Sequence, residues 1–191
     1  MSHRVKHSPK RIAVFCGANA GARAIYAETA RLVGRLLVER GLGVVFGGGR
    51  IGLMGALADA ALEAGGEVIG VIPQALVDRE QAHGGLSELH VVTTMHERKA
   101  LMTDRADGFL ALPGGFGTMD ELFEAITWRQ LGYHQKPAAL LNVDGCYDGL
   151  AAYLERAVAD GFIGSLNERL LVGAEPAALL DRLIESAAAR A

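Results

Sequence analysis

Short apolar runs alternate with segments of helical period along most of the chain. The apolar runs contain few polar positions, which is typical of strands that helices cover on both faces of a parallel sheet. Between these runs, apolar residues recur three and four positions apart, which is typical of helices with one buried side. The predicted strands are 12–16, 44–46, 68–72, 90–93, 109–112 and 138–143, with a seventh at 170–172, and the predicted helices are 24–40, 53–63, 96–106, 119–131, 147–159 and 176–190.

This alternation predicts an α/β fold: a single Rossmann-like domain with a doubly wound, mostly parallel sheet and helices on both faces. We expect the domain to span residues 11–191 and residues 1–10 to form a flexible tail. The connection between Ile72 and His90 is long for a loop in a compact domain, which indicates a functional segment. Ligands of such sheets bind beyond the carboxyl ends of the strands, so the residues after each strand are the candidates for a site.

Composition excludes several classes of protein. The 191 residues are 50% hydrophobic and 21% charged, with a formal net charge of -3. A phosphate-backbone binder would carry a basic stripe, so we expect no nucleic-acid partner. The apolar runs are too short to span a membrane, and residues 1–10 lack the apolar core of a secretory signal. Cys16 and Cys146 have no paired spacing, so we expect no disulfide framework and a cytoplasmic protein.

Two glycine-rich segments follow the first two predicted strands. In the first, 16–21, Asn19 is placed either to bind a ligand or to cap a plain strand-to-helix turn. The second, 47–52, matches the dinucleotide pattern G-x-G-x-x-G, but it follows the second strand. The ribose-binding acid expected about twenty residues further on is also missing. Gly47, Gly48 and Gly49 therefore suit a mononucleotide or phosphosugar better than NAD(P).

The third glycine-rich segment, residues 112–121, reads LPGGFGTMDE. Bare backbone at Gly115 and Gly117, followed at once by a helix, is typical of an anion site, and Thr118 adds a hydroxyl donor. A competing interpretation is a capping box, in which Thr118 and Glu121 only satisfy the first amides of the helix. The sequence leaves both interpretations open.

Arg98 is predicted on the apolar side of its helix, together with Met95 and Met102. A buried guanidinium needs an anion, because leaving it unpaired is very costly. That anion is either a core carboxylate, such as Asp104 or Asp107, or a bound ligand held by the planar fork of the arginine.

Lys99 raises the alternative of a pyridoxal phosphate Schiff base, which its charged neighbours disfavour. The spacing of the His, Cys and Asp residues matches no zinc site, so we expect neither a metal nor another cofactor.

Four motifs occur together in the chain: 46–49, 52–55, Met95-x-x-Arg98-Lys99, and PGGFGT with Glu121 three residues after Thr118. Together they resemble the LOG (Lonely Guy) family, whose motif is PGGxGTxxE and whose members were long described as lysine decarboxylases. The resemblance runs from about residue 11 to residue 168. Ala18 and Asn19 depart from it, because many relatives carry serines there.

The resemblance implies a phosphoribohydrolase that releases the free base and ribose 5-phosphate from cytokinin riboside 5′-monophosphates, such as isopentenyladenosine monophosphate, and often from AMP. It implies a homodimer with the active site near the interface and no cofactor. Arg98 and Glu121 match catalytic positions, and Arg98 would serve either the phosphate or the departing purine. The other residues predicted to bind substrate are Asn19, Gly47, Gly48, Gly49, Glu80, Lys99, Gly115, Gly117, Thr118 and Thr127.

Two other functions remain open at this point. A non-catalytic carrier of a nucleotide or of molybdenum cofactor on the same fold would not need Arg98 and Glu121 together. A pyridoxal-dependent lysine decarboxylase would need a lysine in desolvating surroundings, which Lys99 lacks in the sequence.

Overall fold

Seven parallel strands form one sheet in the order β4-β3-β2-β1-β5-β6-β7. The computed structural model of the protein describes residues 10–79, 81–166 and 169–189. The predicted parallel sheet is confirmed, and each predicted strand lies within two residues of an observed one. The strands are β1 (Arg11–Phe15), β2 (Gly43–Phe46), β3 (Val68–Pro73), β4 (Glu88–Val92), β5 (Gly108–Ala111), β6 (Ala138–Leu141) and β7 (Leu170–Gly173).

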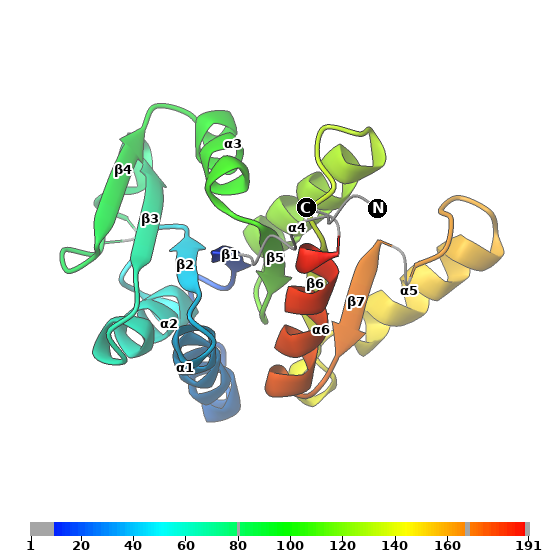
Figure 1. Ribbon diagram of the computed structural model, residues 1–191, viewed down its shortest axis with the longest axis horizontal. Helices are drawn as coiled ribbons and strands as arrows, with labels where there is room; N and C mark the ends of the chain where they lie inside the picture. Colours follow the sequence, from blue (N-terminus) through cyan, green and yellow to red (C-terminus); the bar gives the residue numbers. More distant parts are fainter. Residues whose placement is uncertain (1–9, 80, 167–168, 190–191) are drawn as a thin grey trace, which may run out of the picture.

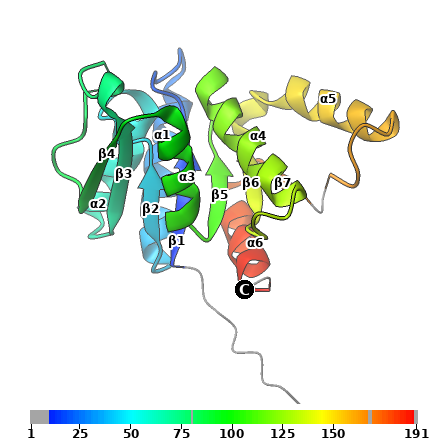
Figure 2. The ribbon, with the colours of Figure 1, turned by 90° about the horizontal axis from the view of Figure 1, so that it is seen from above.

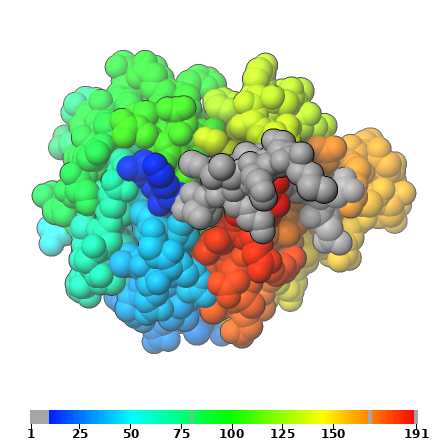
Figure 3. All heavy atoms as spheres, in the orientation of Figure 1, coloured from blue at the N-terminus to red at the C-terminus, as the bar shows by residue number. Residues whose placement is uncertain are grey.

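Six α-helices cover the two faces of the sheet. Helices α1, α2 and α6 lie on one face and α3, α4 and α5 on the other, so the doubly wound prediction is confirmed (Figure 1). On the first face, α6 packs beside α1, and their surfaces adjoin in Figure 3. The helices are α1 (Ala24–Glu39), α2 (Gly52–Glu63), α3 (Met95–Arg105), α4 (Phe116–Gln130), α5 (Asp148–Ala159) and α6 (Pro176–Ala188).

The central strands bury side chains on both faces, which explains their unbroken apolar runs. Along β1, Ile12 and Val14 pack with α1, α2 and α6, whereas Ala13 and Phe15 pack with α3 and α4. Phe109 on β5 is fully buried and stacks on Phe15, with the ring centroids 5.8 Å apart. Burying each such large side chain contributes about 1.5–3 kcal/mol, so the sheet is held from both sides.

The strand order reverses at β1, and this reversal creates the place for a ligand. Strands β1 to β4 are added one after another toward one edge of the sheet, and β5 then pairs with the other side of β1 (Figure 2). The connections that leave β1 and β5 therefore run to opposite faces of the sheet and part at the strands' carboxyl ends. A crevice is expected at this point in an open α/β sheet.

Four helix starts differ from prediction: those of α2, α3 and α5 by one residue and that of α4 by three. Helix α3 begins at Met95 behind a capping box that was not predicted, in which Thr94 Oγ1 accepts from the amide of Glu97 at 3.1 Å. The carboxylate of Glu97 in turn accepts from the amide of Thr94 at 3.3 Å. Helix α4 begins at Phe116, three residues before its predicted start.

The connection after β3 folds back on the glycines that follow β2. It contains a 3₁₀ turn at Gln74–Leu76 and an isolated antiparallel bridge between Gly49 and Ala82. His83 is buried, and its amide donates to the carbonyl of Gly48 at 2.9 Å. Within the described ranges, no helix is long and apolar enough to cross a membrane.

Candidate active site

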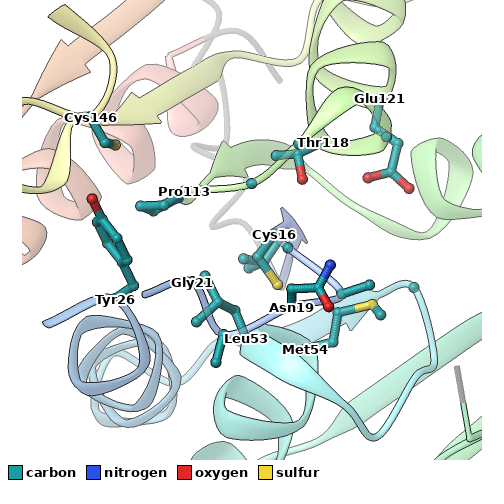
Figure 4. A pocket seen from close by; sticks show the side chains of 18 of the residues that line it. Cys16, Asn19, Gly21, Tyr26, Leu53, Met54, Pro113, Thr118, Glu121 and Cys146 are labelled. Atoms are coloured by element: carbon teal, nitrogen blue, oxygen red, sulfur yellow. The ribbon is translucent and has the colours of Figure 1, made fainter. Parts of the chain in front are cut away.

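A cavity of about 520 Å³ lies where β1, β2 and β5 end. Figure 4 shows Thr118 and Glu121 pointing into it from α4, with Asn19 and Met54 on the opposite side. The cavity is therefore at the reversal of strand order, where the fold predicts a ligand. Its lining includes Cys16, Gly17, Asn19, Tyr26, Gly47, Met54, Met95, Arg98, Gly114, Gly115, Gly117, Thr118, Glu121, Cys146 and Tyr147.

The turn from β5 into α4 presents backbone amides to the cavity. Gly115 is the N-cap residue and carries no side chain that could accept a hydrogen bond from the first turn. The first intrahelical bond there runs from the amide of Met119 to the carbonyl of Gly115 at 3.2 Å, so residues 116–118 have no intrahelical acceptor. With the helix dipole behind them, these amides are suited to an anion.

The capping-box interpretation of Thr118 and Glu121 is wrong. A capping box needs its threonine at the N-cap position, but that position is Gly115, and Thr118 lies inside the first turn of α4. Thr118 is buried, and its hydroxyl points into the cavity (Figure 4). The earlier start of α4 removes the structural role that competed with a role in binding.

Gly114 allows the turn to pack closely against α4. A Cβ atom built on Gly114 would lie 2.0 Å from Oγ1 of Thr118 and 3.0 Å from the amide nitrogen of Gly17. Backbone is present on one side and a buried side chain on the other, so neither neighbour can move away easily. The absence of a side chain at Gly114 therefore lets the ends of β1 and β5 lie close together, where the amide of Gly17 donates to the carbonyl of Pro113 at 3.0 Å.

Arg98 reaches the same cavity from α3 on the other side. It is only 5% exposed, and its guanidinium donates to the carbonyls of Val71 (Nε, 3.1 Å) and Gly47 (NH2, 2.9 Å). The ion pair with Asp107 that the sequence left open does not form, because Asp107 accepts from the amides of Lys10 and Arg11 at the opposite ends of the strands. Arg98 is thus held in a fixed orientation at the carboxyl ends of β2 and β3.

Cys16 lines the same cavity as the two charged residues Arg98 and Glu121. Burial raises the pKa of its thiol, the negative charge of Glu121 raises that pKa further, and the positive charge of Arg98 lowers it. Both charges are therefore close enough to act on the same sulfur atom. A carboxylate and a guanidinium thus line the same partly enclosed cavity as the first turn of α4.

The glycines after β2 do not all have the same place. Gly47 lines the cavity, and a Cβ atom on it would lie 2.0 Å from NH2 of Arg98. Gly48 and Gly49 are buried under the connection that follows β3 and, among the described residues, are not part of the cavity wall. Gly48 has a φ of 77°, which favours glycine, so its role here is in the turn.

Of the remaining predicted residues, two lie away from the cavity wall that the structure describes. The ammonium of Lys99 pairs with Asp120 at 3.0 Å and Glu124 at 2.9 Å on α4. Thr127 is exposed near the end of α4. Glu80 lies outside the described residues. A substrate contact stays a prediction for all three.

Several lining residues were not among the predicted site residues, and of these Tyr26, Cys146 and Tyr147 also lie outside the glycine-rich segments and the four motifs. Tyr26 points from the first turn of α1 toward Pro113 and Cys146 (Figure 4). Cys146 and Tyr147 follow β6, so the rule that ligands bind beyond the strand ends would have found them if it had been applied to that strand as well. Within the same described ranges, no group of three or more His, Cys, Asp or Glu side chains is placed to hold a metal ion.

Comparisons with known proteins identify the family. The family model described as "Possible lysine decarboxylase" matches residues 54–183. The chain is 50% identical, over 92% of its length and 78% of the relative, to a probable cytokinin riboside 5′-monophosphate phosphoribohydrolase, LOGL1, of Oryza sativa subsp. japonica. It is 49% identical, over 85% of its length and 83% of the relative, to the cytokinin riboside 5′-monophosphate phosphoribohydrolase of Rhodococcoides fascians.

The fold is shared more widely. The molybdenum cofactor carrier protein of Chlamydomonas reinhardtii matches with a TM-score of 0.69 over 92% of this chain and 98% of that one, at 21% identity. At this level of identity the likeness extends to the Rossmann-like fold alone. The family model and the sequence identities above show more than a shared fold. The chain belongs to the LOG family, as its four motifs predicted.

The close approach at Gly114 can be tested by adding one methyl group. We expect Gly114→Ala to lower the free energy of unfolding by about 2 kcal/mol, because the methyl group forces Thr118 or Gly17 to move. Gly149→Ala on α5 is the matched control: a Cβ atom there meets nothing within 4 Å, so alanine should stabilise the helix by about 0.5–1 kcal/mol. Denaturant unfolding measures both, and equal values for the two variants would contradict the packing described.

Proposed function

We propose that residues 11–191 form one enzyme domain that hydrolyses the N-glycosidic bond of N6-substituted adenosine 5′-monophosphates, such as isopentenyladenosine monophosphate, and of AMP. The products are the free base, a cytokinin when the base is substituted, and ribose 5-phosphate. The observation that carries this proposal is the meeting of an anion site, a carboxylate and an arginine in one cavity. The relatives named as phosphoribohydrolases support the same activity.

The start of α4 is suited to the phosphate of the substrate. The amides of residues 116–118 point their hydrogens along the helix axis toward the cavity, and the hydroxyl of Thr118 adds a further donor. These groups carry no full charge, so the phosphate is held without a lysine cluster. Asn19, across the cavity, supplies an amide that can replace the serine hydroxyls of the usual family motif.

Glu121 is the group we assign to the sugar. Cleavage of an N-glycosidic bond passes through a state with positive charge on the anomeric carbon, and a carboxylate beside that carbon stabilises or attacks it. Glu121 follows Thr118 by three residues, about 4.5 Å along the helix axis, and so lies one turn further from the phosphate end. A ribose 5-phosphate held at the start of α4 thus extends toward its carboxylate.

Arg98 completes the charge balance of the site. Its guanidinium is held by two backbone carbonyls, so it offers a fixed positive charge rather than a mobile one. That charge can stabilise the phosphate or the negative charge that develops on the purine as it departs. Because this arginine reaches the cavity from α3 and Glu121 from α4, the substrate would lie between the two helices.

The lysine decarboxylase alternative lacks a suitable lysine at this site. Burial lowers the pKa of Lys99, but its hydrogen bonds to Glu124 and Asp120 outweigh that effect, and the net pKa is raised. A Schiff-base lysine needs the opposite shift, because only the neutral amine attacks a carbonyl group. Lys99 is therefore held in the charged form that cannot do this chemistry.

We further propose a cytoplasmic homodimer, with the active site near the interface and no nucleic-acid partner. Phe116 lies between two lining residues of the cavity and is 96% exposed, while Leu131 and Tyr133, beyond the other end of α4, are 63% and 74% exposed. Large apolar side chains in these places are typical of surfaces that another chain covers. Two free cysteines and a net charge of -3 support the compartment and the lack of nucleic acid.

Replacing Glu121 tests the enzyme proposal directly. We expect Glu121→Gln to lower kcat for AMP about 1000-fold, equivalent to about 4 kcal/mol, because the amide cannot stabilise the developing cation. Chromatography of released adenine measures the rate. Glu155→Gln on the exposed side of α5 is the control and should keep full activity. Equal rates for the wild type and Glu121→Gln would exclude the mechanism.

Replacing Arg98 separates a catalytic role from a structural one. We expect Arg98→Ala to remain folded and to lose at least about 100-fold in kcat/KM, since one positioned donor contributes that much in comparable sites. Arg105→Ala, on the same helix and 35% exposed at its side chain, should change kcat/KM less than twofold. A large drop in thermal stability of Arg98→Ala with unchanged turnover of the folded fraction would instead assign Arg98 to the core.

The oligomeric state can be determined by measuring the molar mass of the protein in solution. Light scattering across a concentration series should give twice the chain mass of 20.1 kDa. A mass equal to one chain at all concentrations would contradict the dimer.

A further inference from the structure

A tyrosine outside the predicted motifs holds the turn that carries the anion site. Tyr147 directly precedes α5 and is 7% exposed. Its hydroxyl donates to the carbonyl of Leu112 at 2.7 Å. Leu112 is the last residue before the Pro113-Gly114-Gly115 turn, so this hydrogen bond acts at the point where β5 ends and the turn begins.

The backbone on both sides of this point is held by other parts of the sheet. The amide of Leu112 donates to the carbonyl of Phe15 at 2.9 Å, and the carbonyl of Pro113 accepts from the amide of Gly17 at 3.0 Å. Pro113 has no amide hydrogen and therefore donates no hydrogen bond at this point. The carbonyl of Leu112 accepts from the side chain of Tyr147, which comes from the segment after β6.

The direction of these carbonyls decides whether the turn attracts or repels an anion. A carbonyl oxygen that faced the cavity would place partial negative charge against a phosphate, whereas the amides of α4 place partial positive charge there. The carbonyls of Leu112 and Pro113 are both bound by protein donors. The hydroxyl of Tyr147 thus helps to keep the negative ends of the peptide dipoles away from the ligand.

Tyr147 is itself fixed by the end of β6. Its amide donates to Oδ1 of Asn142 at 2.8 Å, and the side-chain amide of Asn142 donates to Oδ1 of Asp148 at 2.7 Å. The amide of Asn142 donates to the carbonyl of Gly173, at the end of β7, at 2.8 Å. The backbone of Tyr147 is therefore connected by hydrogen bonds to the ends of β6 and β7, which fixes the position of its hydroxyl beside the turn.

We propose that Tyr147 is a positioning residue for phosphate binding: its hydroxyl holds the Leu112 carbonyl so that the β5–α4 turn presents its amides to the substrate phosphate. This inference rests on the proposed function, because that function places the phosphate at this turn. Burial raises the pKa of the Tyr147 phenol, so the hydroxyl stays protonated and donates over the whole working range of pH. It acts through the turn and transfers no proton.

Removing the hydroxyl alone tests this role, since Tyr147→Phe leaves the ring in the cavity wall. Calorimetry should show the dissociation constant of ribose 5-phosphate rising about tenfold, as expected for one lost hydrogen bond, with that of adenine unchanged. The KM for AMP should rise by a similar factor while kcat changes less than threefold. Tyr153→Phe, on α5 at a 65% exposed position, is the matched control and should leave all four constants unchanged.

Several results would overturn the inference. Equal loss of affinity for ribose 5-phosphate and adenine, a fall in kcat alone, or no change at all would each show that Tyr147 does not act on the phosphate end. If Tyr147→Phe does not fold, Asn142→Ala removes the acceptor that holds the Tyr147 amide and should give the same selective loss for ribose 5-phosphate. If Asn142→Ala instead loses affinity for ribose 5-phosphate and adenine equally, the inference is also contradicted.

The binding measurements also separate this inference from the proposed function. If the wild type binds ribose 5-phosphate without releasing adenine from AMP, the enzyme proposal fails, and the selective loss still tests Tyr147. If the wild type hydrolyses AMP and Tyr147→Phe behaves identically, only the inference about Tyr147 fails. If the wild type neither binds ribose 5-phosphate nor releases adenine from AMP, both fail.

Discussion

The carbonyl groups at the carboxyl end of β5 have to find donors within the protein, and the arrangement of the site follows from this requirement. Where a strand ends, its peptide dipoles stop being paired, and in a phosphate site the N–H ends must face the ligand while the C=O ends must not. Here the donors come from Gly17 after β1 and from Tyr147 after β6. The strand order that puts β5 between β1 and β6 therefore also orients the turn that starts α4.

The acidic residues of α4 are compatible with an anion site at its start because their side chains project from different sides of the helix. Asp120 and Glu124 are four residues apart, share one side of the helix, and pair with Lys99 on α3. Glu121 is rotated by one residue, about 100°, and points into the cavity (Figure 4). The carboxylates of Asp120 and Glu124 are thus paired with a lysine, whereas the carboxylate of Glu121 lines the cavity.

Prediction from the sequence was accurate for the elements and less so for their ends. Runs such as 44–46 and 109–112 were found because a strand buried on both faces must be apolar throughout. The start of α4 was placed three residues late, since Thr118 and Glu121 have the spacing of a capping box, although the helix begins at Phe116 with Gly115 as its N-cap. Helix starts depend on which backbone groups are satisfied by distant parts of the chain, and local pattern does not contain that information.

The site was predicted in part for the same reason. Arg98, Glu121 and the glycines of the β5–α4 turn were found because their residue types and spacing already imply charge and bare backbone. Gly48 and Gly49 have the same composition as Gly47, yet only Gly47 reaches the cavity, because the connection after β3 folds over the other two. The position of Tyr147 after β6 could have been noticed, but its hydrogen bond to Leu112 could not be predicted from local pattern, since the two residues lie 35 positions apart in the chain.

The sequence by itself determines the order of the elements, their apolar faces and the family motifs, because each depends on residues that lie within a few helical turns or one strand of one another along the chain. The tertiary structure alone decides which glycine after β2 lines the cavity, which acid of α4 faces it, and which hydroxyl bonds to the end of β5. Those choices depend on contacts between strands that are remote in the chain, and the reversal at β1 brings these strands together.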